Sequence, residues 1–345
     1  MTNLQAIFEK SKSEKSFDLN DRVLIIDCTN SFIRIITSVP IFDVKKQNTG
    51  IIIAFLRSIG MNIRDFKASR CILVFDGVGG SVRRKEIFPE YKANRTGTVK
   101  HKGTEDGELS DDEIKENIKL QFERILTYLD CLPLQVVRVN NIEADDVIAF
   151  ITKQYFEHSS NKIRIVSTDR DFLQLVNDRI EVYSPVKKKI YYPSEIKAEL
   201  GIIVENYLLY RTLTGDASDN IKGIAGLKLK TIIKLFPDIV HTKLNYDDIF
   251  EYARNRLIKN KLYKLILNSK EQLDINHQIM QLAKTDISDE SIKCITDVIT
   301  KENNKLNKLK FLELLNEDSI SSSIATDTGR WLYNTFNTLN SWSKT

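Results

Sequence analysis

The chain has 345 residues, enough for about two domains, and its formal net charge is +4. Hydrophobic residues make up 42% and charged residues 28%, a balance that excludes a wholly disordered chain. No apolar run approaches the ~18 residues of a membrane-spanning helix, the N-terminus carries no signal-peptide core, and the four scattered cysteines exclude a disulfide framework or a zinc site. The composition therefore predicts a globular, cytoplasmic protein.

Strands and helices are predicted to alternate over the first half of the chain. Three apolar runs rich in β-branched residues predict buried parallel strands: Val23–Asp27, Cys71–Asp76 and Ile163–Thr168. Three longer stretches predict helices: Gly50–Phe66, Glu113–Leu129 and Ala144–Phe156. This alternation predicts an α/β fold with a mainly parallel sheet, whose ligand site lies beyond the carboxyl ends of its strands.

A cationic segment follows the second predicted strand. Five cations lie close together, with one aromatic residue among them, and they are its candidate nucleic-acid contacts: Arg83, Arg84, Lys85, Tyr91, Lys92 and Arg95. The segment fits either a solvated basic helix or a patch that holds phosphates and stacks Tyr91 on a base. Thr96–Asp112 is polar, contains three glycines and is predicted to be a mobile surface segment.

The second half of the chain is predicted to be mainly helical. The run NIKGIAGLKLKT contains a glycine turn that opens a helix, and its backbone amides and cations are candidate phosphate contacts. These candidates are Gly223, Gly226, Lys228, Lys230 and Thr231. A plain tight turn between two helices fits this run equally well. Residues from about 238 onward are rich in Lys, Asn and Leu and are also predicted to form helices.

Nine carboxylates stand where apolar segments meet loops or helix starts. They are Asp27, Asp76, Glu143, Asp145, Asp146, Asp169, Asp171, Asp216 and Asp219. Taken singly, each acid is most often a helix cap or a solvated side chain. Several that meet at one sheet edge would repel one another and need compensation, for which oxygen ligands select Mg²⁺ or Mn²⁺. The joint pattern predicts a site for two divalent ions, which suits phosphodiester hydrolysis.

Five motifs follow one another between Val23 and about Phe236: LIID, LVFDG with RRKEIFPEYKANR, IEADD, STDRDF and GDASDNIKGIAGLKLKT. Together they resemble the 5′-nuclease family of flap endonucleases and 5′→3′ exonucleases. The size and the C-terminal third are similar to the phage branch of that family, near the ribonuclease H of T-even-type phages. The resemblance implies a mixed, mainly parallel sheet flanked by helices, a helix–three-turn–helix and a helical C-terminal region.

The resemblance also implies roles for the acids and the cations. Asp27, Asp76 and Asp145 would favour the first of two Mg²⁺ ions, for which Mn²⁺ can substitute. Glu143, Asp169, Asp171 and Asp216 would hold or bridge to the second ion, with Asp146 and Asp219 in the first or outer shell. Lys92 and Arg95 would be the catalytic cations, Arg83 and Arg84 would support phosphates, and the glycine turn would hold duplex DNA.

The implied organisation is a nuclease domain over residues 1–204, with a flexible arch at about 83–120 through which a single-stranded 5′ end passes. A DNA-binding element over 205–240 and a helical region over 241–345 follow. The implied protein is a monomer in the cytoplasm, of the host if phage-encoded, that cuts 5′ flaps, nicks and RNA–DNA hybrids during replication. A sliding clamp and a single-strand-binding protein are suggested as partners.

Two positions depart from the family pattern. Cys28 stands where a glycine is usual, which leaves Phe32 as the candidate for stacking on the 5′ nucleotide. Lys228 replaces a third hairpin glycine, which argues against a K⁺ site there. Two other functions remain as alternatives: a non-catalytic nucleic-acid-binding module, and a single-strand ribonuclease of the related PIN type, which lacks both the hairpin and the arch.

Overall fold

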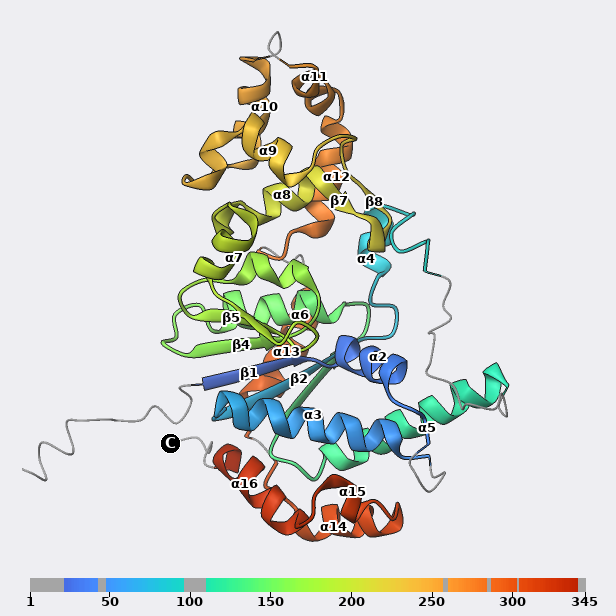
Figure 1. Cartoon of the computed structure of the whole chain (residues 1–345). Helices are drawn as coiled ribbons and strands as arrows, with labels where there is room; N and C mark the ends of the chain where they lie inside the picture. The colour runs from blue at the N-terminus through green and yellow to red at the C-terminus, as the bar shows by residue number, and fades with distance from the viewer. Residues whose placement is uncertain are drawn as a thin grey trace, which may run out of the picture.

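A six-stranded sheet forms the centre of the protein (Figure 1). The computed structural model describes residues 22–42, 48–95, 110–256, 260–283, 287–302 and 304–340. The strand order is β3-β2-β1-β4-β5-β6; β1 to β5 run parallel and β6 runs antiparallel to β5. The strands are β1 (Arg22–Asp27), β2 (Arg70–Asp76), β3 (Gln135–Val139), β4 (Lys162–Val166), β5 (Ile180–Ser184) and β6 (Lys189–Tyr191). The mixed, mainly parallel sheet is thus confirmed.

The three predicted strands are the three at the middle of the sheet, β1, β2 and β4. Val23, Leu24 and Ile25 of β1 are fully buried, because helices cover both faces of the sheet. The strands that the sequence did not mark, β3, β5 and β6, lie toward the two edges. Polar residues interrupt these outer strands, which weakens their apolar pattern.

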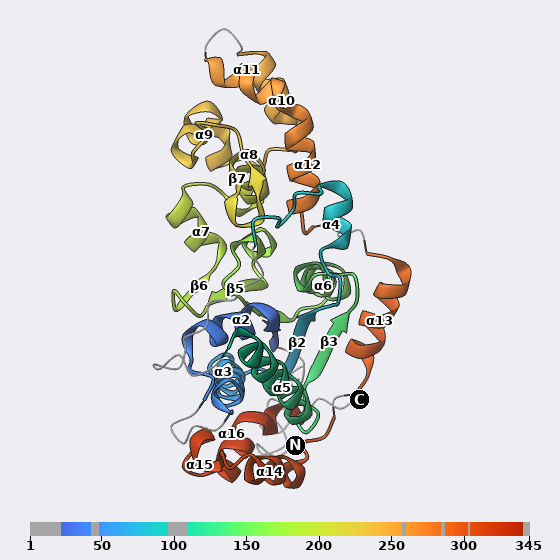
Figure 2. The same cartoon turned by 90° about the vertical axis from the view of Figure 1, so that its right-hand side faces the viewer.

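Helices from distant parts of the chain cover the two faces of the sheet (Figures 1 and 2). One face carries α2 (Cys28–Ser38), α3 (Gly50–Phe66) and α5 (Asp111–Leu129), which share a core with α14 (Lys308–Glu317), α15 (Ser321–Ile324) and α16 (Thr328–Asn340). The other face carries α6 (Ala144–Phe150), continued as a π-helical turn over Ile151–Tyr155, and α13 (Asp289–Thr300). The predicted helix Gly50–Phe66 has the observed bounds of α3.

A smaller helical part stands on the side of the sheet that carries β5 and β6 (Figures 1 and 2). Its elements are η2 (Arg170–Leu175), α7 (Pro193–Leu200), η3 (Val204–Asn206), α8 (Tyr207–Thr214), β7 (Gly215–Asp216), η4 (Ala217–Asp219), β8 (Ile221–Lys222), α9 (Leu229–Leu235), η5 (Pro237–Val240), α10 (Tyr246–Arg254), α11 (Lys261–Asn268) and α12 (Lys270–Met280). The short α4 (Val82–Ile87) contacts α12. The predicted pair of helices around the glycine turn is therefore α8 and α9.

The helical C-terminal region does not pack as one body. Its first helices, α10 and α11, pack against each other, and α12 packs on α8. Next, α13 lies against the edge strand β3, where the Gln135 amide donates to the carbonyls of Val298 and Ile299. Finally, α16 packs on α3. The region 241–345 therefore braces both the helical part and the sheet.

Two sequence-based predictions concern segments that lie partly outside the described residues. Most of the predicted mobile segment Thr96–Asp112 lies outside the described ranges. Within the predicted arch at 83–120, the described parts include the helix α4 and the start of α5, where Ser110 and Glu113 form a capping box. Among the described helices, none combines the length and the apolar composition that crossing a membrane requires.

Candidate active site

The carboxylates predicted at strand ends meet at one edge of the sheet. Asp27 ends β1, Asp76 ends β2, Glu143 caps α6 after β3, and Asp169 follows β4. Parallel strands bring their carboxyl ends to the same edge. Hydrogen bonds fix two of these side chains, because Asp27 Oδ2 accepts from Ser167 Oγ at 2.9 Å and Asp76 Oδ1 accepts from the Ala144 amide at 2.6 Å.

Arg84 lies inside this acidic cluster. Its guanidinium contacts Glu143 at 2.5 Å, Asp146 at 2.8 Å and Asp145 at 3.1 Å, and only 2% of the residue is exposed. The structure differs here from the sequence-based prediction of a phosphate contact on the surface. The reason is electrostatic, since a charge this deeply buried needs opposite charges around it, and three carboxylates supply them. Arg83 does remain partly accessible and pairs with Asp146 at 2.9 Å.

Tyr91 also differs from its prediction as a stacking aromatic. The residue is 2% exposed, and its hydroxyl bonds to Glu143 at 3.0 Å and to Asp219 at 3.2 Å. The next residue, Lys92, places Nζ 2.6 Å from Glu143 Oε1, and Arg95 pairs with Asp219. The cations expected from the sequence to be catalytic, Lys92 and Arg95, therefore pair with Glu143 and Asp219, and Tyr91 bonds to the same two acids.

A second group of acids surrounds Arg211, a residue the sequence analysis did not single out. Arg211 on α8 contacts Asp171 at 2.9 Å and also pairs with Asp216. The signal that would have found it is its position five residues before Asp216, about one helical turn and a half. Arg84, Lys92 and Arg211 together place three cations among the nine predicted acids.

Burial and mutual repulsion shift the pKa values of several of these acids upward. Desolvation raises the pKa of Asp27 to about 7, and desolvation together with the neighbouring Asp169 raises that of Asp171 to about 7. Desolvation and Asp145 raise the pKa of Asp146 to about 6 and also raise that of Glu143. Burial is the main cause of these shifts, and repulsion between neighbouring carboxylates adds to it.

The metal-free protein should therefore lose stability as the pH rises. An acid whose folded-state pKa exceeds its unfolded value of 3.8 binds its proton more tightly when folded. Its contribution is complete below that unfolded value and disappears as the pH passes the folded one. We expect the melting temperature in EDTA to fall by several degrees between pH 5.5 and 8, measured by calorimetry. Divalent ions should offset the fall at pH 8, and a loss of equal size with the ions present would contradict the assignment.

The glycine turn lies between α8 and α9, and its two predicted glycines differ in role. A Cβ on Gly223 would meet the Thr214 carbonyl oxygen at 2.1 Å, so the absent side chain lets the strand β8 pass close to β7. Gly226 instead has φ +86°, and a Cβ there would make only an ordinary contact, 3.8 Å from Leu262 Cδ2. Lys228 caps α9, followed by Lys230 and by Thr231, whose amide donates to the Lys228 carbonyl.

Substitution at Gly223 should be far more damaging than at Gly226. Gly223→Ala forces apart β7 and β8, which carry Asp216, whereas Gly226→Ala adds only backbone strain of about 1 kcal/mol. We expect a clear fall in melting temperature and a large loss of any metal-dependent activity for Gly223→Ala, and near-normal values for Gly226→Ala. Thermal unfolding of the two variants side by side checks this, and equal effects would contradict it.

The acids offer a donor set that fits hard divalent ions, since their ligand atoms are carboxylate oxygens. Across the described ranges, no three Asp, Glu, His or Cys side chains are placed to hold one ion. Arg84, Lys92 and Arg211 lie between the carboxylates in this structure and pair with them.

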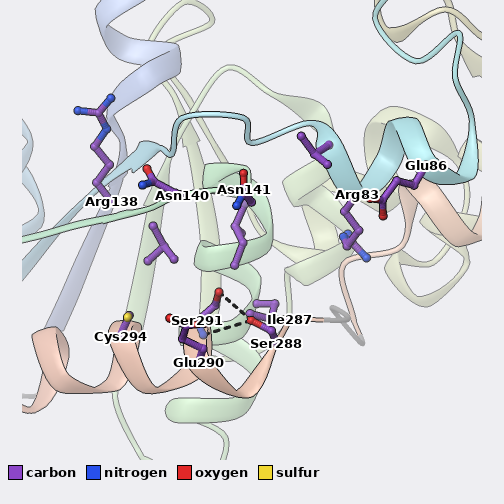
Figure 3. Close-up of a pocket in the computed structure, with 13 residues that line it drawn as sticks. Arg83, Glu86, Arg138, Asn140, Asn141, Ile287, Ser288, Glu290, Ser291 and Cys294 are labelled. Atoms are coloured by element: carbon purple, nitrogen blue, oxygen red, sulfur yellow. Dashed lines mark hydrogen bonds between the residues drawn. The ribbon is translucent and has the colours of Figure 1, made fainter.

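A pocket of about 680 Å³ adjoins the cluster without being part of it (Figure 3). It lies between α4, the loop after β3 and the first turn of α13, and Arg83 borders both the pocket and the acids. Its cations Arg83 and Arg138 are balanced by Glu86 and Glu290. This balance favours no anionic ligand, so the carboxylate edge remains the candidate site.

Phe32 lies in an aromatic cluster beside the site. Its ring meets Phe122 edge-on at 5.2 Å and Phe55 at 6.2 Å. Cys28, where the family pattern has glycine, is fully buried at the start of α2. The stacking role of Phe32 stays a prediction.

Comparison with known proteins agrees with this geometry. The family described as "5'-3' exonuclease, N-terminal resolvase-like domain" matches residues 22–201, just over half of the chain. This chain belongs to the 5′-3′ exonuclease family. The family resemblance inferred from the five motifs is thereby confirmed, and the member described here is a nuclease.

Two relatives in this family align with most of the chain. It is 27% identical over 252 residues to the 5'-3' exonuclease of Buchnera aphidicola subsp. Schizaphis graminum (strain Sg), covering 70% of this chain and 81% of the relative. The 5'-3' exonuclease of Aquifex aeolicus (strain VF5) is 25% identical over 285 residues, 81% of this chain and 88% of the relative.

A solved structure shares the fold of this family member. The bacteriophage T5 flap endonuclease, crystallised in a pseudo-enzyme-product complex with DNA and metal ions, superposes with a TM-score of 0.61 at 22% sequence identity. The match covers 86% of this chain and 99% of the phage chain. It confirms the predicted fold class, including the helical part beyond the sheet.

Proposed function

We propose that this protein is a divalent-metal-dependent, structure-specific 5′ nuclease that acts on DNA and on RNA–DNA hybrids. The observation that carries the proposal is that Asp27, Asp76 and Asp169 stand at one edge of the sheet, at the ends of β1 and β2 and directly after β4. Lys92 pairs there with Glu143 at 2.6 Å. The T5 flap endonuclease, which shares the fold, was crystallised with DNA and metal ions, and this supports the same substrate class here.

Two Mg²⁺ ions, or Mn²⁺ in their place, would bind the acids in two groups. Asp27, Asp76 and Asp145 form the first group, and Glu143, Asp169, Asp171 and Asp216 form the second, with Asp146 and Asp219 beside them. Such ions lower the pKa of water and neutralise charge on the attacking and leaving oxygens of a phosphodiester. The proposal includes no K⁺ site at the hairpin, where Lys228 replaces a glycine.

The chain's own residues position the substrate and stabilise the reacting phosphate. Lys92 Nζ and the Arg95 guanidinium stand next to the acids and would donate hydrogen bonds to phosphate oxygens as negative charge grows on them. The Tyr91 ring lies against the Lys92 ammonium group, because Lys92 Nζ is 4.7 Å from the centre of the ring. Glu143 orients Lys92 through the same pair.

Duplex DNA would bind at the glycine turn, away from the cut. The Lys228 and Lys230 ammonium groups, the backbone near Gly226 and the Thr231 side chain would contact phosphates, and phosphate contacts do not depend on the base sequence. A single-stranded 5′ end would pass near the segment that follows Arg95. Specificity would then come from the shape of the DNA junction.

The proposal is tested with 5′-labelled flap, nicked and RNA-primed substrates, incubated with Mg²⁺ or with EDTA and followed by product sizing. Short 5′ products that form only with Mg²⁺ support it. Metal-independent cleavage, or binding without cleavage on every substrate, would contradict it; the second outcome would favour a non-catalytic binding module.

The cellular role that we propose is removal of RNA primers and flaps during phage-type DNA replication, by a monomer in the cytoplasm. A sliding clamp and a single-strand-binding protein would be its partners there. Stimulation of flap cleavage by either partner, measured as an increased rate on pre-bound substrate, tests this role.

A further inference from the structure

Arg211 joins two carboxylates that come from different parts of the fold. Asp171 belongs to η2, directly after the central sheet, whereas Asp216 belongs to β7, beyond α8. Arg211 Nε donates to Asp171 Oδ1 at 2.9 Å, and the same guanidinium donates to Asp216 Oδ2. About one sixth of each side chain is exposed, so water screens the three charges only partly.

The electrostatics of the two acids depend on this cation. Arg211 opposes the rise that burial and Asp169 impose on the pKa of Asp171. At Asp216, where burial alone would raise the pKa, the Ser218 hydroxyl and Arg211 lower it instead. One guanidinium pairs with both carboxylates, and this geometry holds Asp216 next to Asp171.

Arg84 and Arg211 differ in how firmly they are held. Arg84 also donates from Nε to the Ile279 carbonyl at 2.9 Å, which anchors it independently of the acids. In the described part of the chain, the hydrogen bonds of the Arg211 side chain all go to the two carboxylates. Arg211 is thus free to move when the acids acquire another partner.

We propose that Arg211 is a positioning residue. In the metal-free protein its positive charge substitutes for that of the second divalent ion, and when this ion binds, Arg211 releases Asp171 and Asp216 to it. The inference rests on the proposed function, because it needs these two acids to be ligands. The guanidinium prearranges ligands that are distant in sequence, and its own charge lowers their affinity for the ion.

The test compares Arg211→Gln with Arg170→Gln, a matched control in which the neighbouring cation pairs with Glu199 instead of the acidic cluster. Mn²⁺ is titrated into each protein without DNA by isothermal calorimetry. Even with the screening of bulk water, a unit charge a few ångströms from a divalent ion is worth roughly tenfold in affinity, so tenfold is a lower bound at this partly buried site. We expect Arg211→Gln to bind one Mn²⁺ at least about tenfold more tightly than wild type, and Arg170→Gln to match wild type.

Thermal unfolding separates this role from a merely structural one. Arg211→Gln should melt several degrees lower than wild type in EDTA, and saturating Mn²⁺ should remove most of the difference. An equal deficit in EDTA and in Mn²⁺, with unchanged Mn²⁺ affinity, would overturn the proposal. A wild-type protein that binds no Mn²⁺ at all would instead overturn the proposed function, and the inference with it.

A measurement on the wild-type protein does not depend on how the variant folds. With ¹⁵N-labelled arginine, the Nε–H resonance of Arg211 should be protected from exchange in EDTA and should shift and lose protection as Mg²⁺ is added. The Arg84 resonance, anchored by a carbonyl, should keep its protection. An Arg211 signal that stays unchanged at saturating Mg²⁺ would overturn the proposal.

Discussion

Asp171→Asn is expected to abolish cleavage while leaving binding to branched DNA within about twofold of wild type. The substitution keeps the shape of the side chain but removes one charged ligand from the second proposed ion position, beside Asp169 and Asp216. Metal ions contribute several kcal/mol to such reactions, so a loss of at least about 10³-fold in turnover follows. Asp216→Asn should behave in the same way.

The measurement combines single-turnover cleavage of a 5′-flap substrate in Mg²⁺ with gel-shift binding in EDTA. Asp65→Asn is the matched control, since Asp65 lies exposed on α3. Wild-type cleavage by Asp171→Asn would contradict the ligand assignment. A loss of DNA binding as large as the loss of cleavage would show that Asp171 serves the fold or the DNA contact instead.

Lys92→Ala is expected to lower turnover about 10²- to 10³-fold, the usual effect of removing one donor that stabilises transition-state charge. The KM should change only a few-fold, because Lys92 is one of many cations near the substrate. Folding should be little affected: Lys92 already has φ +57°, its side chain is 21% exposed, and the anchoring bond from its amide to the Asp219 carbonyl is retained by alanine.

Two comparisons sharpen this prediction. Lys85→Ala, an exposed cation on α4, should change affinity more than turnover. Lys92→Arg should recover part of the activity, since it restores a charged donor near Glu143. An effect of Lys92→Ala on KM alone, with turnover unchanged, would move Lys92 from the reacting phosphate to the general DNA-binding surface.

The position of the site could be predicted from the sequence because two local signals coincide there. Strands such as Val23–Asp27 are marked by continuous apolar residues, and the acid at the end of each strand has a fixed place once the strands run parallel. Helix α3 is amphipathic along its full length, so its bounds were also predictable. The acidic edge of the sheet could therefore be predicted without information on contacts between distant residues.

The inward orientation of Arg84 and Tyr91 could not be predicted in this way. A run of cations with an aromatic residue is typical of a solvated, DNA-facing surface, and nothing local distinguishes it from a buried one. The partners that bury these side chains, Glu143 and Asp219, stand 52 or more positions away in the sequence. The contact of Arg211 with Asp171 across 40 positions escaped prediction for the same reason.

The contacts that α12 makes with Arg84 and with the segment before the glycine turn limit how far this enzyme can be truncated. The Ile279 carbonyl anchors Arg84, and the Asn276 amide donates to the carbonyls of Thr212 on α8 and Lys222 on β8, directly before the glycine turn. Both residues lie outside the stretch 22–201 that defines the family. A fragment trimmed to that stretch would keep the six strands of the central sheet and seven of the nine proposed acids, but it would lose Asp216, Asp219 and the contacts of α12. An expression boundary should therefore fall no earlier than Met280. Premature stop alleles upstream of that point should behave as complete nulls.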